Sequence, residues 1–286
     1  MITQTASVVN SRTPVNVIPT ENSFTPTAQF SSPTPEEIIE PTLEETPQPI
    51  PTPIPQTTAA STAIPEPAAD ASAIQLYSPG PQSKIVSPLI VYGYALPGYH
   101  NKGRVDLYGE DGRLITSEVL QLNTSYKWAY FYWPLPFTTY AAGELGRLSL
   151  STLDQYGRIT ALNSVHVLLL PEGESVVNPP GDLRERCILE QPVAGMQYKG
   201  GVLTVSGKIL PFNNLPLKVE LVGRDGSLAN SQLVPITPSG TDFIPFRVDM
   251  PYSLVRRDWE LLTVSQYDDR IGGLMYVFSQ EFYLTP

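Results

Sequence analysis

The sequence has little of the chemistry that disulfides and metal sites require. Its 286 residues include one cysteine, Cys187, and two histidines, His100 and His166. A single cysteine excludes an intrachain disulfide, and we interpret Cys187 as a small buried hydrophobe. The two histidines are far apart in the chain, so no cluster of histidine and cysteine has the spacing of a zinc site. We expect His100 in a loop and His166 on the solvent-facing side of a strand, and we predict no metal and no cofactor.

Catalytic motifs are missing as well. The chain contains no G-x-S-x-G elbow, no H-E-x-x-H motif and no phosphate-binding loop. A calcium site needs about six to eight oxygen ligands, whereas Glu110–Asp111, Asp225 and Asp268–Asp269 are single or paired acids in turn-like surroundings. We therefore predict no catalytic residues and no enzymatic activity, with an enzyme built on loops as the weakest alternative.

Long apolar runs and a basic excess are also absent. No stretch has the length of a transmembrane helix, and the first residues lack the apolar run of a signal peptide. The formal net charge of −10 argues against nucleic acid and anionic membrane surfaces as partners. Either the protein is cytoplasmic or an export signal precedes Met1. The composition of the residues that follow favours the second alternative, so we expect an extracytoplasmic protein, at the cell surface or secreted.

Proline is abundant, with thirty residues that are concentrated near the start of the chain. Residues 1–73 are rich in proline, threonine and glutamate and hold eight acids but a single base, Arg12. Such a tract cannot bury enough apolar surface to offset the entropy of ordering it. We predict that residues 1–73 form a disordered stalk or linker with extended polyproline II character.

The rest of the chain repeats itself. "VYGYALPG" at 91–98 aligns with "VSGKILPF" at 205–212, and "VDLYGEDGRL" at 105–114 aligns with "VELVGRDGSL" at 219–228. Both matches have the same offset of 114 residues. The chain therefore contains two tandem copies, 74–171 and 187–286, joined by a linker at 172–186.

Each copy has the pattern of an all-β domain. Short runs of valine, leucine, isoleucine and tyrosine alternate with turn residues, and neither copy shows a helical period. Val105 and Leu107 alternate with polar residues, as Val219 and Leu221 do in the second copy. The turns "EDG" and "RDG" between strands require glycine with positive φ. About 100 residues and seven short strands per copy predict two tandem immunoglobulin-like β-sandwich domains.

The two copies resemble the immunoglobulin-like domain of bacterial spore germination proteins, which also occurs in tandem in other bacterial surface and lipoprotein-like chains. The resemblance rests mostly on residues of turns and core. They are Pro79, Pro88, Val91, Gly93, Asp111, Gly112, Trp128 and Phe131 in the first copy, and Pro192, Val205, Gly207, Asp225, Gly226, Phe243 and Phe246 in the second. The resemblance implies a non-catalytic extracytoplasmic module for binding or spacing.

One strand of the first copy, "SYKWAYFYWPLPF" at 125–137, is exceptionally aromatic. Alignment with the second copy separates its two faces. One face is apolar in both copies and is predicted to face the core. It consists of Ala129, Phe131 and Trp133, which align with Ile244, Phe246 and Val248. The other face consists of Tyr126, Trp128, Tyr130 and Tyr132, which align with Thr241, Phe243, Pro245 and Arg247.

The face with the tyrosines is therefore the candidate binding site, because the shared fold does not require Tyr126, Tyr130 and Tyr132. Tyrosines on an exposed strand can stack on a sugar or on a partner surface. The alternatives are packing between the two domains or cover by a loop. We predict a non-catalytic protein of the bacterial cell envelope that acts in binding, adhesion or scaffolding, with a protein or a cell-wall glycan as partner. A carbohydrate-binding module that uses the aromatic strand is the alternative function.

Overall fold

The computed structural model describes residues 70–124, 127–237 and 242–286, and the predicted stalk before Asp70 lies outside them. The first half of this part contains β1 (Ile74–Ser78), β2 (Lys84–Val86), β3 (Leu89–Ala95), a short 3₁₀ helix η1 (Tyr99–Asn101), β4 (Lys102–Tyr108), β5 (Leu114–Gln121), β6 (Ala129–Leu135), β7 (Glu144–Leu153) and β8 (Ile159–Leu170). The second half contains β9 (Cys187–Gln191), β10 (Gln197–Tyr198), β11 (Val202–Ile209), β12 (Leu217–Val222), β13 (Leu228–Val234), β14 (Ile244–Pro251), β15 (Asp258–Tyr267) and β16 (Leu274–Leu284). None of the described residues forms a helix with the length and apolar character needed to cross a bilayer.

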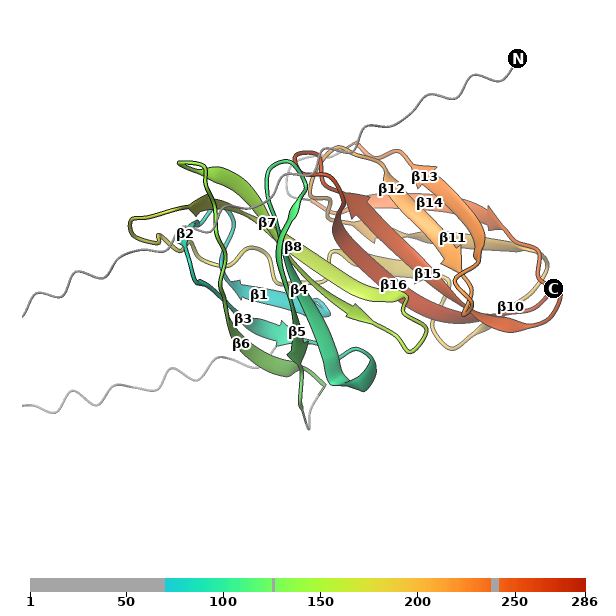
Figure 1. Cartoon of the computed structure of the whole chain (residues 1–286). Helices are drawn as coiled ribbons and strands as arrows, with labels where there is room; N and C mark the ends of the chain where they lie inside the picture. Colours follow the sequence, from blue (N-terminus) through green and yellow to red (C-terminus); the bar gives the residue numbers. More distant parts are fainter. Residues whose placement is uncertain (1–69, 125–126, 238–241) are drawn as a thin grey trace, which may run out of the picture. The chain divides into compact units, whose positions relative to one another are not determined.

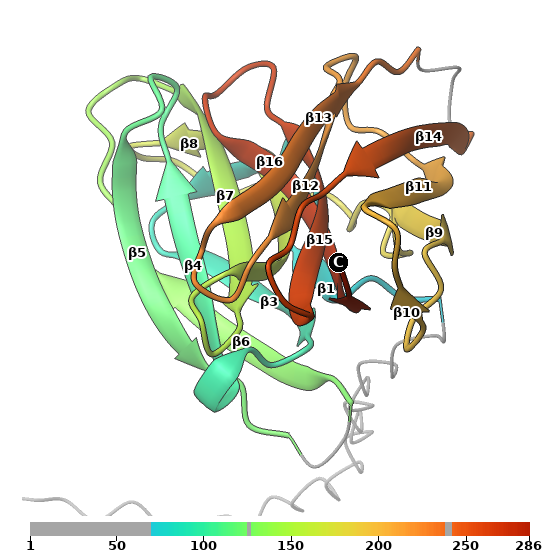
Figure 2. The same cartoon turned by 90° about the vertical axis from the view of Figure 1, so that its right-hand side faces the viewer.

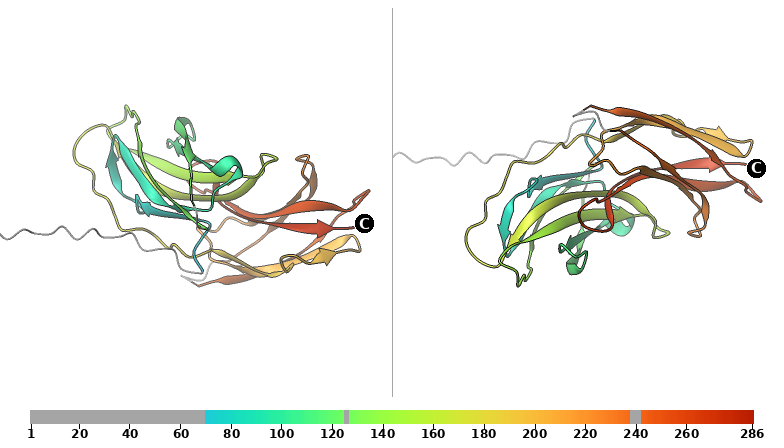
Figure 3. Two further views of the ribbon diagram at one scale, coloured as in Figure 1. Left: turned by 90° about the horizontal axis from the view of Figure 1, so that it is seen from below. Right: turned by 90° about the horizontal axis from the view of Figure 1, so that it is seen from above.

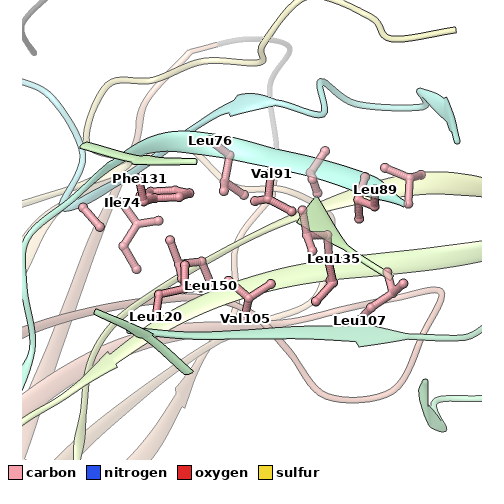
Figure 4. Packing of buried hydrophobic residues seen from close by; sticks show 14 of the residues in the cluster. Ile74, Leu76, Leu89, Val91, Val105, Leu107, Leu120, Phe131, Leu135 and Leu150 are labelled. Atoms are coloured by element: carbon pink, nitrogen blue, oxygen red, sulfur yellow. The ribbon is translucent and has the colours of Figure 1, made fainter. Parts of the chain in front are cut away.

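The first sandwich consists of two β-layers around one apolar core. One layer has the strand order β1-β3-β6, and the other has the order β8-β7-β4-β5, with β2 parallel to β8. The apolar side chains of Leu76, Val91 and Phe131 point from the first layer toward Val105 and Leu107 of the second (Figure 4). Val105 and Leu107 are completely buried, so the strand alternation in the sequence placed them correctly.

The second sandwich repeats this arrangement strand for strand. Its layers are β9-β11-β14 and β16-β15-β12-β13, with β10 parallel to β16 (Figures 2 and 3). The turns after β4 and β12 contain Gly112 and Gly226 with φ of 78° and 79°, as predicted from the "EDG" and "RDG" motifs. The described residues thus form two tandem immunoglobulin-like β-sandwiches, and both lie in one compact unit.

The two sandwiches share a continuous sheet. The last strands of the copies, β8 and β16, pair antiparallel over Ala161–Asn163 and Tyr276–Phe278 (Figure 1). The resulting order is β13-β12-β15-β16-β8-β7-β4-β5. β8 and β16 are equivalent strands of the two copies. The order is therefore symmetric about their junction, and β7, β4 and β5 on one side correspond to β15, β12 and β13 on the other.

A buried ionic cluster lies beside this junction. Arg147 of β7 is 2% exposed, and its Nη1 donates to Oδ2 of Asp268 at 2.9 Å. The same guanidinium donates to the carbonyl oxygens of Ile271 and Gly272, at 2.7 and 2.9 Å. Nε2 of His166 lies 2.8 Å from the same carboxylate oxygen of Asp268. A cation from the first sandwich therefore holds the turn between β15 and β16 of the second.

This cluster corrects the expectation for His166, which we predicted to face solvent. His166 does lie on β8, but its side chain is only 14% exposed because the Asp268 turn covers it. Burial raises the pKa of Asp268, but hydrogen bonds from His166, the Arg270 amide and Arg147 outweigh this effect and hold the pKa well below its ordinary value. Asp268 is thus ionised and engaged in structure.

Replacing Asp268 with alanine should lower the free energy of unfolding by about 3–5 kcal/mol, because the buried Arg147 guanidinium loses its counter-charge. The matched control is Asp269→Ala, which removes the same charge from an exposed position in the same turn and should cost less than about 0.5 kcal/mol. Urea unfolding at pH 7, followed by tryptophan fluorescence, measures both. Equal destabilisation by the two variants would contradict the assignment.

The same cluster predicts a pH dependence. A lowered folded-state pKa means that the Asp268 contribution is present above the ordinary value of 3.8 and is lost as the pH falls below it. The difference in stability between the wild type and Asp268→Asn should therefore shrink on acidification below about pH 4. A difference that stays constant between pH 7 and pH 3 would contradict this prediction.

Candidate binding surface

The predicted aromatic residues around β6 do not form one group. Tyr126 lies outside the described residues. Tyr130 and Tyr132 point away from the core and are 44% and 56% exposed. Trp128 precedes β6 and is half-buried at a different location. Of the four predicted residues, the structure therefore places Tyr130 and Tyr132 side by side on the outer face of the β1-β3-β6 layer.

Trp133 is a correction to the predicted core. Ala129 and Phe131 are buried as expected, but Trp133 is 37% exposed. β6 is an edge strand, so an inward-pointing side chain there is covered from one side only. Val248, its smaller counterpart on β14, packs against the second core. The indole of Trp133 is too large for the same space and extends to the surface.

Three further tyrosines complete the aromatic surface. Tyr92 and Tyr94 of β3 lie directly opposite Tyr132 and Tyr130 in the β-ladder, and Tyr77 of β1 lies against both β3 tyrosines. Ring centroids are 6.5 Å apart for Tyr77–Tyr92 and for Tyr92–Tyr132, with 22° and 20° between the ring planes. Tyr94 and Tyr130 meet edge to face at 5.6 Å. We call these five residues the tyrosine face.

Two local features of the backbone build the tyrosine face. The register of β1 against β3 shifts between Leu76 and Ser78, so Tyr77 is the extra residue of a bulge that re-aims its side chain. A side chain at Gly93 would place its Cβ 1.9 Å from the carbonyl oxygen of Gln75. Only glycine lets β1 approach β3 closely enough for Tyr77 to reach the β3 tyrosines.

The sequence contained a signal for the tyrosines of β3. In "VYGYA" the inward positions are Val91, Gly93 and Ala95, which leaves Tyr92 and Tyr94 on the outer face. The second copy has "VSGKI" there, so Ser206 and Lys208 take their places. Tyr77 had no such signal, because the bulge that exposes it is a feature of strand pairing.

The second sandwich provides an internal comparison for the tyrosine face. The ladder pair Tyr92–Tyr132 corresponds to Ser206–Arg247, and Tyr94–Tyr130 corresponds to Lys208–Pro245. The bulged residue equivalent to Tyr77 is Glu190. The same backbone thus presents an aromatic surface in the first sandwich and a polar, charged surface in the second.

Trp128 belongs to a cleft of about 680 Å³ that opens where β8 and β16 diverge. Its walls include Trp128, Tyr156, Glu185 and Glu281. Several polar groups of these walls are engaged within the chain. The indole Nε1 of Trp128 donates to the carbonyl oxygen of Ser72 at 3.3 Å, and Glu281 accepts a 2.6 Å hydrogen bond from Arg158.

Glu185, another wall residue, is also occupied. It accepts hydrogen bonds from the Tyr276 hydroxyl and from the amides of Ala73 and Arg186. The carboxylate therefore ties the inter-copy linker to Ala73, the residue before β1, and to β16. The cleft is lined by groups that hold the two sandwiches together, which favours a structural role for Trp128.

Among the described residues, no three His, Cys, Asp or Glu side chains converge in a group that could hold a metal ion. Cys187 is buried as expected, and burial raises the pKa of its thiol. Glu260 is an acid whose pKa is raised: burial, and next the charge of Asp258, raises it to about 6. Glu260 is only 4% exposed and lies opposite the core residue Phe282 in the ladder, so it is closed to a substrate.

Neither a protein-family profile nor a curated protein sequence matches the chain. The solved structures that are similar to it include the following three. The titin domains Z1Z2 in complex with telethonin share 14% identity over 75% of this chain and 96% of theirs, with a TM-score of 0.20. A chimeric titin Z1Z2–Z1Z2 tandem gives 13% identity over 74% and 98%, with a TM-score of 0.22. Red sea bream transglutaminase gives 11% over 75% of this chain and 32% of its own, with a TM-score of 0.28. At these values the similarities carry no argument about function.

Glu260→Gln should stabilise the protein at pH 8, on the order of 1 kcal/mol. Because the folded-state pKa of Glu260 is raised, protonated Glu260 contributes stability to the wild type. This contribution is fully present below the ordinary pKa of 4.5 and is lost as the pH rises through about 6. Thermal unfolding midpoints at pH 8 and pH 4 test this, with the exposed Glu190→Gln as control. An advantage for Glu260→Gln that is equally large at pH 4 would contradict the role of ionisation.

Proposed function

We propose that this chain is a non-catalytic binding protein of the bacterial cell envelope, and that the tyrosine face of its first sandwich is the surface that binds the partner. The observation that carries the proposal is the difference between the copies. The fold does not need aromatic side chains at these positions, because Ser206, Lys208 and Arg247 occupy them in the second sandwich. The aromatic cluster therefore needs an explanation beyond folding.

Exposure supports binding over internal packing. The two sandwiches meet through β8 and β16, not through β6. Tyr130 and Tyr132 remain exposed among the described residues, although exposed aromatic surface is costly in water. Tyrosine is enriched where proteins bind partners, because each ring offers a large rigid area and a polar tip.

The extracytoplasmic location is part of the proposal and rests on the sequence. Residues 1–73 have the composition of a stalk, and the two copies resemble the immunoglobulin-like domain of bacterial spore germination proteins. In this proposal the stalk holds the paired sandwiches away from their anchor, and the ionic cluster around Arg147 connects the two sandwiches.

Binding to isolated cell envelopes tests the assignment of the tyrosine face. The double variant Tyr130→Ala/Tyr132→Ala should lose at least about tenfold in affinity in a co-sedimentation assay. Tyr140→Ala is the matched control, because Tyr140 is 95% exposed and lies outside the tyrosine face. Unfolding midpoints of both variants should stay near that of the wild type. A double variant that is destabilised but binds normally would refute the proposal.

The location has its own test. Protease treatment of intact cells of the source organism, followed by immunoblotting, should degrade this protein and leave a cytoplasmic marker intact. Protection of the protein until the cells are lysed would contradict an extracytoplasmic location.

A further inference from the structure

We infer that the ligand of the tyrosine face is an uncharged polysaccharide, bound as a chain that runs across the β1-β3-β6 layer. This inference rests on the proposed function and specifies the chemical class of its partner. It is carried by the charge, the chemistry and the regular spacing of the side chains on this surface.

The surface is free of charge. Among the described residues, the outward positions of β1, β3 and β6 hold Gln75, Ser78, Ile90, Pro134 and the five tyrosines. Gln75 and Ser78 are buried, so the accessible part of this surface consists of Ile90, Pro134 and the tyrosines. The equivalent strands of the second sandwich present Lys208, Arg247 and Asp249 instead. A surface without charge gives no electrostatic attraction to an anionic polymer, and burying a charged ligand group on it is unfavourable.

The tyrosine face also stays uncharged over the whole physiological range of pH. Burial, and then the neighbouring tyrosines, raises the pKa of the Tyr77 and Tyr130 hydroxyls above their ordinary value of 10.0. These hydroxyls therefore remain protonated and can donate as well as accept hydrogen bonds. A pyranose ring matches this chemistry, because its C–H groups form a flat apolar face while its hydroxyls project around the rim.

The spacing favours a polymer. Tyr77, Tyr92 and Tyr132 follow one another across three adjacent strands, with centroid steps of 6.5 Å and 20–22° between successive rings. A row of similarly oriented rings offers the same contact several times, which suits a ligand with repeating units. Affinity should therefore increase from the monosaccharide to short oligosaccharides of the same sugar.

A protein partner fits these observations less well. Protein interfaces obtain specificity from complementary charges, and arginine is among their enriched residues. The outward positions of these strands provide neither arginine nor any other charge within the described part of the chain. We therefore treat a protein ligand as an alternative outcome of the experiment.

The experiment uses the full chain and isolated cell envelopes that have been treated in two ways. Mild periodate, which cleaves the vicinal diols of sugars, should abolish co-sedimentation. Digestion of the envelopes with protease, followed by inactivation of the protease, should leave it unchanged. Loss of binding after protease treatment together with full binding after periodate treatment would overturn the glycan inference and leave the proposed binding function intact. Absence of binding to untreated envelopes would refute the proposed function itself.

Single-residue variants connect the glycan to the row of rings. Tyr132→Ala removes the exposed end of the row and should weaken binding at least about tenfold, whereas Tyr132→Phe retains the ring and should weaken it less. The control Tyr140→Ala should bind like the wild type. Affinity electrophoresis in gels that contain hydroxyethyl cellulose, galactomannan or dextran, with alginate as the anionic comparison, measures the selectivity. Stronger retardation by alginate than by every neutral polysaccharide, or periodate-sensitive binding that is unaffected by Tyr132→Ala, would overturn the inference.

Discussion

The pairing of β8 with β16 is the constraint on which the rest of the structure depends. It converts two separate sandwiches into one compact unit with a shared sheet, and it uses only three residues of each strand. So short a pairing needs support from side chains. The guanidinium of Arg147 provides it by binding Asp268 and two carbonyl groups of the opposite turn in a nearly dry environment. Arg158 adds a second connection through Glu281 and the carbonyl oxygen of Val222.

This junction also determines which surfaces are left for other tasks. It occupies the edge of the large sheet in both copies, and the three-stranded layers keep their outer faces uncovered by it. One of these faces carries five tyrosines and no charge at its outward strand positions, and the other carries polar and charged side chains. The two copies therefore share a scaffold and differ in the chemistry that the scaffold presents.

Much of this fold could be predicted from the sequence because repetition and alternation are local patterns. The core positions Val105 and Leu107 and the turn glycine Gly112 followed from strand period and from the "EDG" motif. The environment of His166 could not be predicted, because its partner Asp268 lies in the other copy and meets it only through the junction. Tyr130 and Tyr132 could be predicted from the alternation of the aromatic strand. Tyr77 of β1 could not, because its place on the surface depends on a bulge in the pairing of β1 with β3.

The symmetric strand order has a consequence for how such a chain can grow. Each sandwich uses the free edge of its last strand, β8 or β16, to pair with the other, so the contact is isologous. Once two copies have paired, neither has such an edge left. A third copy added to the chain would find no matching edge and would stay an independent domain, whereas a fourth could pair with it. A longer array of this repeat would therefore consist of paired domains. Its flexible linkers would lie between the pairs and not between the two domains of a pair.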